Sequence, residues 1–294
     1  MTRTSFIALV GRPNVGKSTL LNSILGEKVA IVSKKPQTTR NRITGIHTVG
    51  EDQYVFLDTP GMHSPKNSLG EFMVKTADTS MRDADAVVLV VDTGKEITTV
   101  EENVISYLKK SGIPAILALN KIDMYDREQL AETISKYAEK HDFVAFVPIA
   151  AKKNKNVPEL MAECSKFLGE SDWFFPEDMI TDQPERQIAA EIIREKILRT
   201  LNKEIPHGTA VVIEEFKDEG TLVRIRAEIF CEKASHKGII VGKGGASLKL
   251  IGTYAREDLE KLLGAKVYLN LWVKVKENWR DSQRGITDFG FTED

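Results

Sequence analysis

The sequence predicts an α/β domain with a mostly parallel sheet, followed by a smaller α+β domain. Its 294 residues are enough for two domains. In the first part, short apolar runs alternate with helical patterns, which is typical of parallel strands covered on both faces. After residue 185 two strand patterns follow each other directly, so the element order changes. We expect a first domain over 1–170, a connector over 171–185 and a second domain with a C-terminal tail over 186–294.

Composition narrows the class of protein. Apolar and charged contents of 41% and 29% are ordinary for a globular chain. Because the formal net charge is −2, any surface that binds nucleic acid must be local. Cys164 and Cys231 lack the spacing of metal ligands, so we expect reduced thiols in a cytosolic protein. We expect no membrane span, because no stretch approaches 18 apolar residues, and no signal peptide, since the N-terminus leads straight into a strand pattern.

A glycine-rich loop separates the first strand pattern, residues 6–10, from a helical pattern over 19–25. The loop consists of Gly11, Arg12, Pro13, Asn14, Val15, Gly16, Lys17 and Ser18. Its glycines let the backbone approach a phosphate, and the following helix N-terminus favours negative charge. Lys17 can reach the β- and γ-phosphates and Ser18 can ligate Mg²⁺, so the loop is typical of a P-loop.

The remaining elements of the first domain continue the alternation. Strands are predicted over residues 42–49, 53–58, 86–92, 115–120 and 144–148, and helices over 69–81, 100–110, 127–140 and 157–168. In such a sheet, ligands bind at the carboxyl ends of the strands. The residues that follow each apolar strand are therefore the candidate site residues.

The strand over 53–58 ends in the tetrad Asp58, Thr59, Pro60 and Gly61. Asp58 can hold Mg²⁺ through a water on the γ-phosphate side, and Gly61 can present its N–H to that phosphate. The next residue is Met62, where Ras-type enzymes carry the glutamine that orients the attacking water. Since a thioether cannot orient water, we expect slow hydrolysis by the protein alone.

The strand over 115–120 leads into Asn120, Lys121 and Asp123. Guanine presents two donors on one edge, and the carboxylate of Asp123 can accept from both. Adenine would leave that carboxylate unpaired, which is costly in a binding site. We expect Asn120 to brace the loop and Lys121 to lie along the base, so the nucleotide is GTP or GDP.

The three motifs in this order resemble the translation-factor class of P-loop GTPases. That class usually has a Ser-Ala-Lys element with backbone contacts to guanine, and Ala150, Ala151 and Lys152 stand at the matching place. The missing hydroxyl at residue 150 removes one bond that stabilises the turn, not the recognition of the base.

The polar segment 34–42 is predicted to be a mobile switch loop. A threonine there can complete the Mg²⁺ shell when GTP is bound, and the loop offers Gln37, Thr38, Thr39 and Arg40. Resemblance to GTPases with a Thr-Thr-Arg switch favours Thr39, beside Ser18 and Asp58. In related GTPases with Pro-Asn in the P-loop, the asparagine helps to bind K⁺; Asn14 either does so or only shapes the loop.

The second domain begins with a helical pattern and then has two strand patterns. Its elements are a helix over 188–201, strands over 209–216 and 221–230, helices over 235–240 and 246–263, and a strand over 266–275. Between the last two helices lies the tetrad Gly242, Lys243, Gly244 and Gly245, inside a stretch, 233–256, with five basic residues and no acid.

This order resembles the type II KH domain, in which the GxxG loop clamps single-stranded nucleic acid. Lys237, Lys243 and Lys249 would supply charge toward the nucleic-acid backbone. We expect the apolar floor of the groove to be built by Ile239, Ile240, Val241, Leu248 and Leu250.

The two halves and the connector together closely resemble the bacterial Era family. The resemblance implies a GTP-controlled assembly factor for the small ribosomal subunit, whose KH domain binds single-stranded rRNA near its 3′ end. It also implies a cytoplasmic monomer with peripheral attachment to the inner membrane. We expect the aromatic connector to pack where the domains meet and to couple nucleotide state to RNA binding.

Two alternatives differ in class. One is a constitutive RNA-binding module whose nucleotide site is mainly structural, and turnover that does not rise with ribosomal subunits or RNA would favour it. The other is a small-molecule P-loop kinase, which Asp123 disfavours because such enzymes need no guanine reader.

Overall fold

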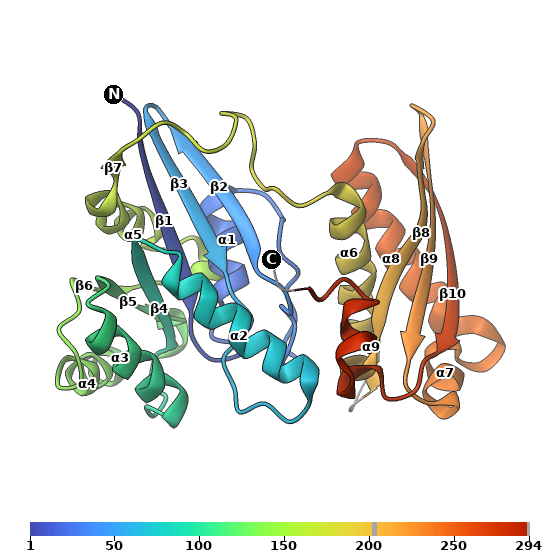
Figure 1. Cartoon of the computed structure of the whole chain (residues 1–294), viewed down its shortest axis with the longest axis horizontal. Helices are drawn as coiled ribbons and strands as arrows, with labels where there is room; N and C mark the ends of the chain where they lie inside the picture. Colours follow the sequence, from blue (N-terminus) through green and yellow to red (C-terminus); the bar gives the residue numbers. More distant parts are fainter. Residues whose placement is uncertain (202–204, 293–294) are drawn as a thin grey trace. The chain divides into compact units, whose positions relative to one another are not determined.

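The computed structural model describes residues 1–201 and 205–292. The chain divides into two compact units, Met1–Pro65 with Gly70–Asp182, and Lys66–Leu69 with Gln183–Asp294. Figure 1 labels the elements of both units. In the described ranges, no helix is both long and apolar enough to cross a bilayer.

The first unit is built on a mostly parallel sheet. Its strands are β1 (Arg3–Val10), β2 (Ile43–Val49), β3 (Asp52–Asp58), β4 (Ala86–Asp92), β5 (Ala115–Asn120), β6 (Ala145–Pro148) and β7 (Gly169–Glu170). Their order is β2-β3-β1-β4-β5-β6, and the short β7 pairs with β1. Among the described strands of this sheet, only the β2–β3 and β1–β7 pairs are antiparallel.

Helices cover both faces of this sheet, as the sequence predicts. They are α1 (Lys17–Leu25), α2 (Ser68–Arg82), α3 (Thr99–Ser111), α4 (Arg127–Ala138) and α5 (Val157–Cys164). Ile7 and Leu9 of β1 join the apolar cluster that contains residues of α1 and α5. Ala8 and Val10 join the cluster of α3 on the other face. Successive strand residues point to opposite faces, so a strand buried on both sides must be apolar throughout.

Residues 171–182 belong to the first unit, where they run beside β2 and β3. The side chain of Gln53 accepts hydrogen bonds from the backbone N–H groups of Phe174 and Phe175. The N–H of Ile46 donates to the carbonyl of Ile180 at 2.9 Å. These bonds hold the N-terminal part of the predicted connector on the edge of the first sheet.

The second unit packs helices on one face of a sheet with the order β10-β9-β8. Its elements are α6 (Glu185–Thr200), β8 (Ala210–Asp218), β9 (Leu222–Cys231), α7 (Ala234–Val241), α8 (Ala246–Leu263), β10 (Lys266–Val275) and α9 (Gln283–Thr287). β9 is antiparallel to β8 and parallel to β10. The inward residues of the strands form one apolar cluster with residues of α6, α7 and α8.

The short helix α9 has no counterpart in the sequence prediction. Five residues are too few for a periodic apolar pattern. The helix is instead fixed by the Ser282 hydroxyl, which accepts from the Gly285 N–H, and by the buried Trp279 just before it. The ring of Trp279 lies 4.9 Å from that of Phe289, centre to centre.

Candidate functional site

The predicted motifs meet at one edge of the first sheet. β1, β3, β4 and β5 run parallel, so their carboxyl ends lie together. The register pairs Asp58 with Leu9, next to the P-loop, and Asp92 with Asn120. Residues separated by more than 100 positions, such as Val15 and Asn120, are thereby brought side by side.

The P-loop depends on two glycines in unusual conformations. Gly11 has a φ of +143°, and a Cβ there would lie 2.3 Å from the carbonyl oxygen of Val90. Gly16 has a φ of +107°, and a Cβ would lie 2.2 Å from the side-chain nitrogen of Asn120. Neither position can take a larger residue without rebuilding the loop.

Lys17 is buried within that loop. Its Nζ donates hydrogen bonds of 3.0 Å to the carbonyls of Gly11 and Arg12, so the loop backbone holds the ammonium in place. Burial lowers the pKa of Lys17 to about 8. An ammonium whose charge is penalised by burial is stabilised by an anion such as a phosphate.

The side chain of Arg12 faces away from the phosphate loop. It forms an ion pair with the fully buried Glu101 of α3. Glu101 also accepts from the N–H and the hydroxyl of Thr98 and so caps α3. The spacing of Thr98 and Glu101 in the sequence indicates a helix cap. The ion pair of Glu101 with Arg12 is visible only in the folded structure.

Three candidate magnesium ligands converge at the start of α1. The Ser18 hydroxyl donates to Asp58 Oδ2 at 2.6 Å and lies 2.9 Å from the hydroxyl of Thr39. Thr38 points elsewhere, and its hydroxyl donates to the carbonyl of Lys35 at 2.7 Å. The structure therefore places Thr39, rather than Thr38, beside Ser18 and Asp58.

Asp58 has the chemistry of a cation ligand. It is completely buried, and burial raises its pKa to about 6 against the opposing effect of Lys17. Within the described residues, its Oδ1 has no hydrogen-bond partner. A buried carboxylate oxygen without a donor is costly, and a divalent cation would satisfy it.

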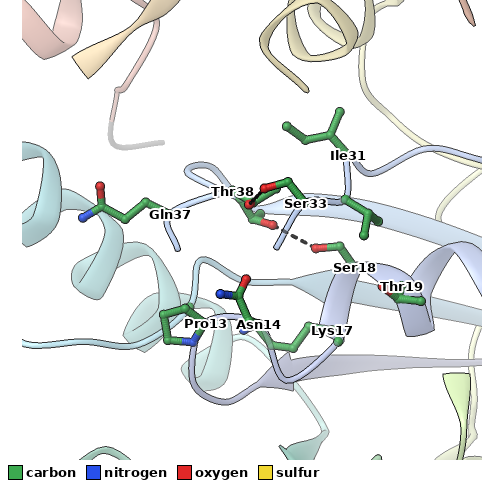
Figure 2. A pocket seen from close by; sticks show the side chains of 13 residues that line it. Pro13, Asn14, Lys17, Ser18, Thr19, Ile31, Ser33, Gln37 and Thr38 are labelled. Carbon is green, nitrogen blue, oxygen red and sulfur yellow. Dashed lines mark hydrogen bonds between the residues drawn. The ribbon is translucent and has the colours of Figure 1, made fainter. Parts of the chain in front are cut away.

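The switch loop and the P-loop line one pocket, which Figure 2 shows from close by. Asn14, with a φ of +65°, donates from its amide to the carbonyl of Lys34 at 2.9 Å. Gln37, also left-handed at +57°, brings its side-chain nitrogen to 3.2 Å from Nε2 of His63. No motif in the sequence indicates His63, which lies two residues after Gly61.

The tetrad from Asp58 to Gly61 is anchored by contacts with backbone atoms. The Thr59 hydroxyl donates to the carbonyl of Leu9 at 2.8 Å. Gly61 lies against the P-loop, where a Cβ would be 2.7 Å from Cα of Pro13. The side chain of Met62 packs against the apolar cluster on the α3 face. It is therefore turned toward the core and is not placed to orient a water.

Asn120 holds three loops together. Its amide donates to the carbonyl of Val15 at 2.7 Å, and its Oδ1 accepts from the N–H groups of Lys121 and Ala151 at 2.8 and 3.0 Å. The turn at Ala150 is closed by backbone bonds to Lys155, at 3.1 and 3.2 Å. Backbone pairing thus fixes the turn that lacks the serine hydroxyl.

Two charged partners of the guanine-reading residues are new. Lys121 donates to Asp92 at 2.7 Å and to the carbonyl of Asn14 at 2.9 Å, which stretches its side chain along the site. Lys153 lies 2.9 Å from Asp123, and its hydrogen bond lowers the pKa of that carboxyl. Asp123 is thereby kept ionised and can accept two hydrogen bonds.

The GxxG loop of the second unit is a tight turn between α7 and α8. Gly242, Gly244 and Gly245 all have positive φ, at 73°, 59° and 80°. A Cβ on Gly242 would lie 2.7 Å from that of Ser247. Gly242 therefore lets the loop backbone approach the first turn of α8, while the positive φ of Gly244 and Gly245 shapes the turn itself.

The basic side chains around this loop reach solvent. In the described part of the chain, no carboxylate forms an ion pair with Lys237, Lys243 or Lys249. Such charges are available to a polyanion.

The prediction that Ile240 forms part of the groove floor is wrong. Ile240 is fully buried in the apolar core of the second unit, whereas Ile239 is 50% exposed. Adjacent residues of a helix point about 100° apart, so both cannot line one groove. Leu250 is exposed, and Val241 and Leu248 are partly buried against the core.

Comparisons with known proteins agree with both halves. The family described as 50S ribosome-binding GTPase matches residues 6–121, and the KH domain family matches residues 204–280. GTPase Era of Clostridium kluyveri is 51% identical over 292 residues, covering 99% of this chain and all of the relative. GTPase Era of Clostridioides difficile is 50% identical over 296 residues, covering all of both chains.

Two solved structures match the whole chain at 40% identity. One is Era in complex with MgGDPNP and nucleotides 1506–1542 of 16S ribosomal RNA, with a TM-score of 0.96 and complete coverage of both chains. The other is a point variant of Aquifex aeolicus Era bound to GDP·AlF4⁻, with a TM-score of 0.95 and coverage of 99% and 100%. Full-length identity of about half, together with the matching fold and motifs, shows that this chain belongs to the Era family of GTPases.

Proposed function

We propose that the protein is a GTP-hydrolysing switch that binds small-subunit rRNA near its 3′ end and acts in small-subunit assembly. The observation that carries the switch is the cluster of Ser18, Thr39 and Asp58, because Thr39 belongs to a loop, whereas Ser18 lies at the start of α1 and Asp58 at the end of β3. The Era structure that holds MgGDPNP and 16S rRNA supports the same ligands for this chain.

Each end of the nucleotide has its own residues. The backbone of residues 11–18 and Lys17 bind the phosphates, and Gly61 presents its N–H near the terminal one. Asp123 accepts from guanine while Asn120 and the segment 150–152 hold its loop. Mg²⁺, when bound by Ser18, Thr39 and Asp58, would neutralise charge on the β- and γ-phosphates. Loss of the terminal phosphate then releases Thr39 and its loop.

β2 links the switch loop, which senses the nucleotide, to the connector. β2 starts at Ile43, directly after the switch loop, and it bonds to the connector through Ile46 and Ile180. The Thr181 hydroxyl adds a bond of 2.7 Å to the carbonyl of Thr44. A change in the switch loop can therefore shift the segment that leads to the second unit.

RNA crosslinking of the wild type and Gly244→Asp tests the RNA role. We expect one specific site near the 3′ end of small-subunit rRNA to be lost in the variant, and an unchanged crosslinking map would refute the assignment.

RNA affinity measured with GTP analogue and with GDP tests the coupling between nucleotide state and RNA binding, and equal affinities would contradict that coupling. Turnover that fails to rise with RNA or subunits would favour a mainly structural nucleotide site.

We also propose that Asn14 helps to bind K⁺ beside the phosphates. Its left-handed backbone and its bond to Lys34 place a polar side chain between the P-loop and the switch loop, which supports this role. We expect faster turnover in KCl than in NaCl, and Asn14→Ala should remove the difference. Equal turnover of the wild type in both salts would contradict the proposal.

The family relationship supports three further proposals, namely a monomer, a cytoplasmic location and peripheral attachment to the inner membrane. Light scattering after size exclusion tests the first. Fractionation of cells followed by a salt wash of the membranes tests the other two, since a peripheral protein held by charge is released by salt.

A further inference from the structure

The sheet of the second unit has one open face. Side chains alternate along its strands, and Val223, Ile225 and Val273 point into the apolar core. Figure 1 shows α6 and α8 on one side of the sheet. We call the other side the outer face, and its central residues are Lys217 of β8, Arg224, Arg226 and Glu228 of β9, and Tyr268, Asn270, Trp272 and Lys274 of β10.

Two aromatic rings stand on this outer face. Tyr268 and Trp272 are 54% and 58% exposed. They lie four residues apart on the same strand and so about 13 Å apart along it. Of the C-terminal segment that the structure describes, Phe289 packs on the far end of the face, where its ring centre lies 4.8 Å from that of Phe230. Large aromatic side chains left in water on a folded domain mark interaction surfaces.

One arginine lies beside the ring of Tyr268, and a second lies between the two rings along the register, with Glu215 on its other side. The register places Arg224 beside Tyr268 and Arg226 beside Asn270. The guanidinium of Arg224 lies 5.6 Å from the centre of the Tyr268 ring. Glu228, beside Trp272, is already paired with Lys274. The acid closest to Trp272 along the register is therefore neutralised.

The charge of the outer face is net positive. The face and its hairpin carry Lys217, Arg224, Arg226, Lys266 and Lys274 against Glu215, Asp218, Glu219 and Glu228, an excess of one positive charge. Glu219 is paired with both Lys217 and Arg224, at 3.0 Å each. A polyanion is favoured over an acidic or purely apolar partner only where such an excess exists.

We infer that the outer face is a second binding surface for unpaired RNA, separate from the Gly242–Gly245 loop. Two bases stack on Tyr268 and Trp272, and Arg224 and Arg226 bind the phosphates between them. Stacking accepts any base, and sheet faces that carry aromatic rings bind single strands in this way. The inference rests on the proposed RNA binding but uses none of the residues of the GxxG loop.

The test uses the full chain with GTP analogue and an RNA of 16S nucleotides 1506–1542 as the probe. In the double variant Tyr268→Ser with Trp272→Ser, affinity should fall at least about tenfold. Trp272→Phe keeps a ring and should bind as the wild type does. The matched control is Val275→Ala, on the opposite side of the same strand, and it should have no effect. Ultraviolet crosslinking of the wild type should attach RNA to Tyr268 or Trp272.

Parallel measurements on Gly244→Asp separate the two surfaces. If the aromatic pair matters and Gly244→Asp does not, the outer face stands and the proposed role of the loop fails. Wild-type affinity of the double variant, with no crosslink on the outer face, overturns the inference whatever Gly244→Asp does. If the double variant no longer bound small subunits but bound the RNA as the wild type does, the outer face would contact a protein, and this result would also overturn the inference.

A second variant guards against misfolding of the first. Arg226→Gln leaves both rings in place and should lower the salt dependence of RNA binding by about 0.7 in the log–log slope. An unchanged slope in a variant with an unchanged melting midpoint contradicts the role of Arg226 and with it the phosphate contacts of the face.

Discussion

The nucleotide site and the GxxG region differ in how far their polar side chains are buried. Lys17, Asp58 and Asn120 are almost completely buried and are bonded to the protein itself. Lys237, Lys243 and Lys249 reach solvent around a loop shaped by its glycines. A small ligand of fixed shape can repay the burial of polar groups. A flexible polyanion is instead bound by many separate charges, each contributing little.

This difference predicts two kinds of response to mutation. In the nucleotide site, removal of one partner leaves another polar group, on the protein or on the bound nucleotide, unsatisfied, so single changes are severe. On the exposed surface, each lost charge subtracts one phosphate contact and leaves the rest unchanged. The following variants test that contrast, beginning with the largest expected effect.

Asp123→Asn should reduce GTP affinity about a thousandfold. The amide cannot accept from both guanine donors, and its NH₂ faces the N–H groups of the base. Xanthine presents an oxygen in place of the amino group, so XTP should bind better than GTP. Competition of both nucleotides against a labelled analogue measures this. A variant that still prefers GTP would show that Asp123 does not read the base.

Arg12→Ala should lower the free energy of unfolding by about 3 kcal/mol, because the buried Glu101 loses its counter-charge. Chemical denaturation without nucleotide gives the value. The double variant Arg12→Ala with Glu101→Gln should recover part of the loss. If Arg12→Ala instead impaired only nucleotide binding, its side chain would belong to the phosphate site after all.

Lys243→Gln should weaken RNA binding only a fewfold and lower the salt dependence by about 0.7 per lost phosphate contact. Lys237→Gln and Lys249→Gln should behave similarly and nearly additively. Titrations at several salt concentrations measure both quantities. A hundredfold loss from one lysine would mean that the exposed site behaves like the buried one.

Cys164 should not react with a thiol reagent at pH 8 in the folded protein. It is the last residue of α5 and is fully buried in the apolar core, and burial raises its pKa to about 12. The thiolate, which is the reactive form, is therefore scarce below that pH. Cys231 in the second unit is also buried, and burial raises its pKa as well. Counting modified thiols before and after denaturation checks both, and rapid native labelling of Cys164 would show that the first unit opens locally.

Much of the fold was predictable because its signals are local. The strands 86–92 and 115–120 and the last helix and strand, 246–263 and 266–275, have the predicted bounds. Each is a continuous apolar run or a clear periodic pattern with a polar residue or a glycine at or near its end. The helix predicted over 157–168 ends at Cys164 and continues as a short 3₁₀ turn, because helix ends depend on contacts that periodicity does not record.

The sequence by itself determined the glycine positions and the order of the nucleotide motifs. Residues such as Gly16 and Gly242 are required by backbone conformation, which is a property of the chain alone. Tertiary structure decided which neighbouring side chain reaches the site. It brought Thr39 rather than Thr38 to Ser18, and it paired Arg12 with Glu101. It also left Tyr268 and Trp272 on an open sheet face. Adjacent residues share composition and spacing but point in different directions, and only the packing of distant elements gives those directions a partner.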